Sequence, residues 1–157
     1  MGGDLGPAAV VAGMEKSAEK NSDICFLVFG PEAELKAEVA KTRLGDRCEI
    51  RDVTEVVTMD AKPSHVMRNG KGTSMWAAVD AVKTGEAQAV VSCGNTGALM
   101  AISMIRLRKL PGIDRPAIAC LWPSRNPGGF NVMLDVGADI RADEKDLLQY
   151  ALMGGSY

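Results

Sequence analysis

Apolar residues along this 157-residue chain follow two alternating patterns. Short continuous apolar runs are typical of strands covered on both faces. They fall at 24–29, 48–53 with a loose continuation to 57, 89–93, 116–122 and 130–136. Between them, apolar residues recur every three or four positions, which predicts amphipathic helices. These helices are expected at 7–20, 31–44, 74–84, 98–110 and 143–153.

Strands that alternate with helices predict a mainly parallel sheet with helices on both faces. We expect residues 1–157 to form a single α/β domain. Helix boundaries follow positional preferences: Pro7 suits a first turn, Ser74 can cap the third predicted helix, and Gly85 can end it. Gly154 and Gly155 are expected to end the last helix.

Residues 59–73 interrupt these patterns with a polar, basic stretch that predicts a flexible loop. One interpretation is a solvated connection between elements. The other is an anion gate, in which Arg68 and Lys71 attract a phosphate or an acidic carrier. His65 lies in the same stretch and can act as a base at neutral pH, although a lone loop histidine is more often a bystander.

The stretch 89–98 predicts a strand, a glycine loop and the start of a helix. The first N–H groups of a helix lack intrahelical partners and lie at the positive end of its dipole, so they suit an anion. Gly94 and Gly97 allow close backbone approach, while Asn95 and Thr96 add side-chain donors for phosphate or a polarised carbonyl. The alternative is an ordinary tight turn between strand and helix.

Composition narrows the function classes. A net charge of −2 without a dense basic stripe argues against nucleic acid as the main partner, and 46% hydrophobic residues suffice for a sizeable core. No metal site or cofactor is expected, because the four cysteines form no C-x-x-C pair and His65 is the only histidine. Cys25, Cys93 and Cys120 lie in apolar runs, which predicts buried thiols in a reducing cytoplasm.

One acidic residue stands out. Asp135 places a charge near the end of the apolar run 130–136, and open α/β sheets bind ligands at the C-terminal ends of their strands. It can equally cap the turn that follows.

Six separated stretches together resemble one protein family. They are 1–4 (Met-Gly-Gly-Asp) with 6–7, 74–75, 92 with 94–98, 112–116 (Gly-Ile-Asp-Arg-Pro), 134–138 (Leu-Asp-Val-Gly-Ala) and 154–157. They resemble PlsX, the bacterial phosphate acyltransferase family of phospholipid synthesis. The resemblance covers essentially the whole chain. It implies a Rossmann-like three-layer α/β/α fold akin to isopropylmalate dehydrogenase and phosphotransacetylase, here as the front half of a longer family chain.

The resemblance also implies an activity and partners. A fatty acyl group would pass from acyl carrier protein to inorganic phosphate in a cytoplasmic homodimer, and the full-length family has amphipathic helices associated with peripheral membrane docking. Asn95, Thr96 and Lys71 are the expected catalytic residues. The expected substrate-binding residues are Asp4, Arg68, Ser74, Gly94, Gly97 and Asp135.

The chain departs from the family pattern at Leu5, where the family has histidine, at Cys93, where it has alanine, and at Asp139, where it has asparagine. A noncatalytic α/β domain that binds an anion or needs a missing C-terminal half is the alternative function. A nucleotide-binding oxidoreductase is a weaker one, because residues 94–97 do not supply G-x-G-x-x-G.

Overall fold

The computed structural model describes residues 1–136 and 142–156. The chain divides into two compact units, Met1–Arg108 and Lys109–Tyr157, which are described separately. The motif residues Gly137 and Ala138 and the departure from the family at Asp139 lie outside the described residues, as does Tyr157. No helix in the described part of the chain is long and apolar enough to cross a membrane.

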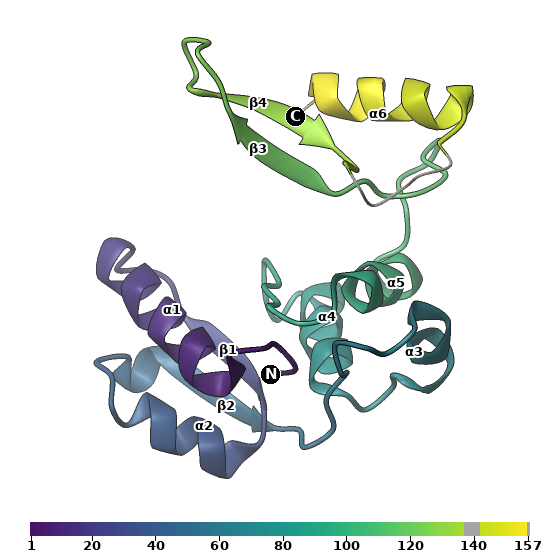
Figure 1. The fold of residues 1–157 in the computed structure, drawn as a ribbon. Helices are drawn as coiled ribbons and strands as arrows, with labels where there is room; N and C mark the ends of the chain where they lie inside the picture. The colour runs from purple at the N-terminus through teal and green to yellow at the C-terminus, as the bar shows by residue number, and fades with distance from the viewer. Residues whose placement is uncertain (137–141, 157) are drawn as a thin grey trace. The chain divides into compact units, whose positions relative to one another are not determined.

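The first unit begins with helix α1 (Gly6–Lys20), strand β1 (Phe26–Gly30), helix α2 (Glu32–Val39), the 3-10 turn η1 (Gly45–Arg47) and strand β2 (Cys48–Asp52). Strands β1 and β2 pair in parallel, with Val28 opposite Ile50. Val11 and Met14 of α1 pack with Val28 of β1 and Leu35 of α2 in one core cluster. Figure 1 shows α1 and α2 beside this strand pair. Helix α1 and the two strands lie close to their predicted bounds, whereas α2 ends at Val39, five residues before the predicted end at 44.

The rest of this unit is helical, with α3 (Pro63–Asn69), α4 (Ser74–Thr84) and α5 (Thr96–Arg106). Val66, Val79 and Ile102, one from each helix, form a second core cluster with Val57. Helix α4 has its predicted bounds and ends at Gly85, whose φ of 79° is the left-handed conformation expected there. Its cap is Thr73 instead of Ser74, since the Thr73 hydroxyl accepts the Trp76 N–H.

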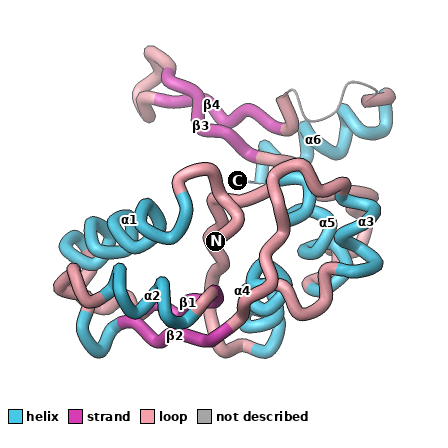
Figure 2. Tube along the Cα trace, turned by 60° about the horizontal axis from the view of Figure 1, so that its bottom comes forward, coloured by secondary structure: helices cyan, strands magenta, loops and turns pink. Residues whose placement is uncertain are grey.

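Several expectations for this unit are wrong. Residues 59–73 are not a loop throughout, because Val66 is 3% exposed and its burial against α5 stabilises helix α3. Residues 89–93 do not form a strand, and Figure 2 draws the connection from α4 to α5 as loop. Val91 is 89% exposed. An apolar run alone does not make a strand, because a strand also needs an extended neighbouring segment with which its backbone can form hydrogen bonds.

The continuation of β2 to residue 57 is wrong for the same reason, since the strand ends at Asp52. The cysteine prediction is also wrong: Cys25, Cys93 and Cys120 are exposed. Helix α5 begins two residues earlier and ends four residues sooner than expected, and Arg108 beyond it has a positive φ of 68°.

The second unit contains strand β3 (Ala119–Pro123), strand β4 (Phe130–Leu134) and helix α6 (Glu144–Ser156). The two strands form an antiparallel hairpin with Leu121 opposite Val132, and α6 contacts β4. The Asp143 carboxylate accepts the Asp146 N–H and the Asp146 carboxylate accepts the Asp143 N–H, so the predicted start of this helix is confirmed. The predicted end is wrong, because α6 continues through Gly154 and Gly155.

The α/β class is confirmed by a small parallel sheet with helices packed against it, consistent with a truncated Rossmann-like domain. The described strands form two separate two-stranded sheets, one parallel and one antiparallel. The larger, mainly parallel sheet expected from the alternation is therefore present only in its β1–β2 part.

Candidate functional site

Asn95 occupies the N-cap of α5, and its side chain is fully engaged. The Oδ1 atom accepts the Ala98 N–H at 2.9 Å. The Nδ2 group donates to the carbonyls of Thr58, Met59 and Ala61 at 3.2, 2.9 and 2.9 Å. Asn95 is 8% exposed. It therefore fixes the segment 58–61 against the start of α5, a role that we did not predict from the sequence.

Two backbone N–H groups remain at this helix start. Within residues 1–136 and 142–156, no protein acceptor is bonded to the amides of Thr96 and Gly97. Thr96 is exposed and Gly97 is partly exposed. Unpaired amides at the positive end of an eleven-residue helix are the elements of an anion site.

The glycines around this helix start allow close packing. A Cβ on Gly97 would lie 2.9 Å from Cγ of Pro63, the first residue of α3. A Cβ on Gly3 would lie 2.6 Å from the Cys93 carbonyl oxygen, and one on Gly2 would lie 2.2 Å from that of Val57. The N-terminal Met-Gly-Gly segment thus runs close to both the glycine loop and the Val57 backbone.

Charged residues of both signs lie in and around α3, the helix that contacts α5. Arg68 on α3 and Lys71 just after it are exposed, and neither has a carboxylate partner within the described ranges. Asp60 lies in the segment that Asn95 holds. Hydrogen bonds from the Thr58 side chain and from its own backbone lower the pKa of Asp60, so it stays ionised at neutral pH.

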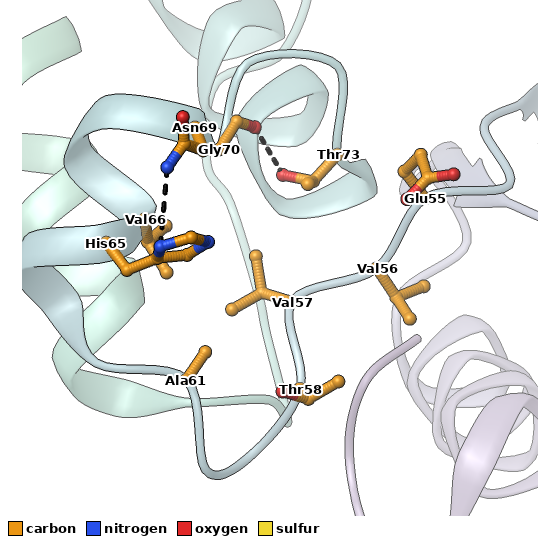
Figure 3. A pocket seen from close by; sticks show the side chains of 10 residues that line it. All are labelled: Glu55, Val56, Val57, Thr58, Ala61, His65, Val66, Asn69, Gly70 and Thr73. Carbon is orange, nitrogen blue, oxygen red and sulfur yellow. Dashed lines mark hydrogen bonds between the residues drawn. The ribbon is translucent and has the colours of Figure 1, made fainter.

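A hollow of about 210 Å³ lies between the segment 55–61 and the residues of and after α3. Figure 3 shows its polar side chains, among which the Asn69 amide lies 3.3 Å from Nδ1 of His65. Val57 and Val66 supply apolar lining. Asn95 holds one wall of this hollow through the Thr58 and Ala61 carbonyls.

Asp135 belongs to the second unit, where its carboxylate is 1% exposed. Oδ2 accepts hydrogen bonds from Nη2 of Arg115 and the hydroxyl of Tyr150, both at 2.9 Å, and Oδ1 accepts the Ile118 N–H at 3.3 Å. Its φ is 55°, a conformation that aspartate tolerates better than most residues. In this unit the carboxylate ties together β4, α6 and the segment before β3.

Comparison with known proteins assigns the chain to a family. A family model described as "Fatty acid synthesis protein" matches residues 1–157. The chain belongs to this family. Relatives named "Phosphate acyltransferase" include those of Jannaschia sp. (strain CCS1), 70% identical, and Ruegeria sp. (strain TM1040), 72% identical. Each alignment covers the whole of this chain, but only 43% and 42% of the respective relative.

The fatty acid synthesis protein family is the one that the six motifs resembled, and the chain corresponds to the N-terminal part of its relatives. Two of those motifs meet in the second unit through the Arg115–Asp135 ion pair. Asp114 of the same motif receives the Gln149 side-chain N–H at 2.9 Å, and its backbone N–H donates to Oε1 of Gln149. The motif residues are thus packing partners as well as candidates for chemistry.

The remaining candidate residues of this family member are spread over the first unit. Asp4 and Leu5 are exposed, and Ser74 is buried with its N–H donating to the Glu55 carbonyl at 2.8 Å. The Gly94 N–H donates to the Ser92 hydroxyl at 3.2 Å. Within the described residues, no three His, Cys, Asp or Glu side chains are grouped to hold a metal ion.

Proposed function

We propose that this chain is the phosphate-binding part of an acyltransferase that moves a fatty acyl group from an acyl carrier protein thioester to inorganic phosphate. The proposal rests on the names of the relatives and on one observation, the two amides at the start of α5 that have no protein acceptor among the described residues. Those relatives are more than twice as long as the matched region, so the remainder of the active site is assigned to the rest of such a chain.

The proposed binding site uses backbone donors more than side chains. The N–H groups of Thr96 and Gly97 bind phosphate oxygens, and the Thr96 hydroxyl adds a third donor. Asn95 acts as a positioning residue, because its amide group is already bonded to three carbonyls. Arg68 and Lys71 lower the electrostatic cost of bringing a dianion to the site and attract an acidic carrier.

In the proposed reaction, a phosphate oxygen attacks the thioester carbonyl carbon. A carbon–oxygen bond forms, the carbon–sulfur bond breaks, and the phosphate proton ends on the carrier thiol. The products are acyl phosphate, which enters phospholipid synthesis, and free carrier. The tetrahedral intermediate places an oxyanion close to phosphate, so preorganised donors contribute more than a protein nucleophile would. Exposed Cys93 has no role in this scheme.

The remaining site residues and the cellular setting belong to the same proposal. We assign to the phosphate site three further residues because of the family motifs in which they lie: Asp4, Ser74 and Gly94. Asp135 contributes indirectly, by holding the second unit together. We propose that the whole protein is a homodimer in the cytoplasm, with peripheral contact at the inner membrane face, and that residues 1–157 form one α/β domain.

Replacement of Thr96 by proline tests the amide directly. Proline is well tolerated at the first position of a helix, and the φ and ψ of Asn95, −59° and 109°, suit a residue before proline. We expect Thr96→Pro to abolish binding of inorganic phosphate in a calorimetric titration while α5 stays folded. Thr96→Ala is the matched control and keeps most of the affinity. Equal affinity of both variants and the parent would overturn the assignment.

The second candidate function is a noncatalytic domain that binds an anion through the same amides at the start of α5. A turnover assay separates the two. The chain, alone and joined to the remaining sequence of the Ruegeria relative, is incubated with acyl carrier protein thioester and phosphate, and free carrier thiol is measured. Carrier release by the joined chain that Thr96→Pro removes supports the acyltransferase. Phosphate binding without release by either form supports the alternative.

A further inference from the structure

Helix α6 carries its apolar residues on the side that faces away from its own unit. On the side that contacts the rest of the unit, Gln149 bonds to Asp114, Tyr150 bonds to Asp135, and Gly154 lies against Leu134. Leu147, Leu148 and Leu152 share the other side and are 60%, 62% and 61% exposed. An amphipathic helix normally buries such a stripe.

The hairpin of the same unit is also incompletely covered. Every residue of β3 is exposed, including Leu121 at 54% and Trp122 at 60%. A two-stranded hairpin packed by a single helix is marginal by itself and needs further strands or a second layer. Exposed apolar surface that is continuous along a helix marks an interaction site.

Two observations decide what covers this face. A membrane-surface helix has lysine and arginine along its polar side, whereas α6 has one lysine and also Glu144 and Asp146, so a lipid surface is disfavoured. The chain spans 43% of its relative from Jannaschia, and it corresponds to the N-terminal part. More than half of the relatives' length therefore follows the matched region. This length is enough to cover the exposed leucine face of α6, which is as apolar as the core of a domain.

We infer that the outward face of α6 (Leu147, Leu148, Ala151 and Leu152) is the docking surface for the segment that follows the matched region in the longer relatives. This segment packs its own apolar side chains on that stripe. The inference depends on packing and does not require the proposed acyl transfer.

The experiment compares the 157-residue chain with a joined chain in which the remaining sequence of the Ruegeria relative follows it. Amide hydrogen exchange of α6 is measured in both. We expect slower exchange in the joined chain. In the joined chain, Leu148→Asp should speed amide exchange of α6 by about 30-fold or more, because it places a charged group in a core. In the 157-residue chain, the same substitution should speed exchange by less than about 3-fold.

Glu144→Ala, on the same helix, is the matched control and should change exchange equally little in both chains. If Leu148→Asp prevents folding of the joined chain, Leu148→Ala gives the same comparison with a smaller change. Equal effects of the Leu148 variants in both chains would overturn the inference. So would a dimer of the 157-residue chain in sedimentation that Leu148→Asp dissociates, because a second copy would then be the occupant.

Discussion

Helices α5 and α6 have similar apolar stripes in sequence but are held in place by different forces. In α5, Ala98, Ala101 and Ile102 are 0%, 7% and 0% exposed and belong to the buried core of the first unit. In α6, the buried residue is Gln149, and the leucine stripe is exposed. Apolar packing thus holds α5, whereas hydrogen bonds and ion pairs to Asp114 and Asp135 hold α6.

This difference teaches that a stripe fixes which residues share a face of a helix, but not which face its surroundings cover. The two helices should respond to different perturbations. Loss of apolar volume should damage α5, and loss of charge should damage α6.

The largest effect is expected from truncation in α5. Ile102→Ala should lower the free energy of unfolding of the first unit by about 3–4 kcal/mol, because it removes a fully buried side chain and leaves a cavity. Urea unfolding followed by fluorescence of Trp76, which packs against the same cluster, measures it. Leu152→Ala on α6 is the matched control in the 157-residue chain, where a change below about 0.5 kcal/mol is expected. Similar losses from both variants would remove the contrast.

Asn95→Ala should destabilise the first unit by about 2–3 kcal/mol. The change removes the N-cap acceptor of α5 and leaves the carbonyls of residues 58, 59 and 61 without their shared donor. The same urea titration measures it. Asn95→Asp separates the two parts, because it keeps the cap acceptor and loses the donor. If Asn95→Ala lowered the free energy of unfolding by only about 1 kcal/mol, the value typical of a lost N-cap, the contacts to the segment 58–61 would contribute nothing.

Asp135→Asn should weaken the attachment of α6 by about 2 kcal/mol. It keeps a side chain that tolerates a φ of 55°, but it replaces one carboxylate oxygen by a donor facing the Arg115 and Tyr150 donors. Faster amide exchange of α6 reports the loss. Asp4→Asn makes the same change in charge at an exposed position of the first unit, and α6 exchange should not respond to it.

The smallest effect concerns pH. Hydrogen bonds from Lys145 and Gln149 lower the pKa of Asp114, and the same contact raises the pKa of Lys145. A lowered carboxyl pKa gives stability that is present above the usual aspartate value and is lost as pH falls through the lowered pKa. A raised lysine pKa gives stability that is lost only as pH rises through that raised value.

The contact at Asp114 should therefore hold α6 across the neutral range and fail in acid, with a modest effect because both groups are exposed. The chemical shift of the Asp114 carboxyl carbon, followed as a function of pH, should titrate with a midpoint below the ordinary aspartate value. Lys145→Ala should bring this midpoint back up, and no response to that substitution would exclude the pair as its cause.

Local elements could be predicted well where short-range chemistry decides them. The bounds of α4 follow from its apolar spacing and from Gly85, and the start of α6 follows from the Asp143–Asp146 pair. The family also follows from the motif order. Helix α3 was missed because only Val66 in it is buried, and one apolar residue produces no periodicity.

The candidate site could be predicted in place but not in detail. The sequence indicated the start of α5, and the roles expected for its residues in phosphate binding stay predictions. Asn95 was expected to donate to a ligand, yet its donors reach carbonyls 34 to 37 residues earlier in the chain. The one available signal was the residue type itself, since asparagine is a favoured N-cap.

The sequence by itself determined where the helices other than α3 form, which residues share a helix face, and which family the chain belongs to, because these depend on neighbours within a few positions and on motif order. Only the tertiary structure decided that residues 89–93 are not a strand and that the leucine stripe of α6 is exposed. A strand needs a hydrogen-bonded neighbour and a stripe needs a covering surface, and both are supplied by residues far away in the chain.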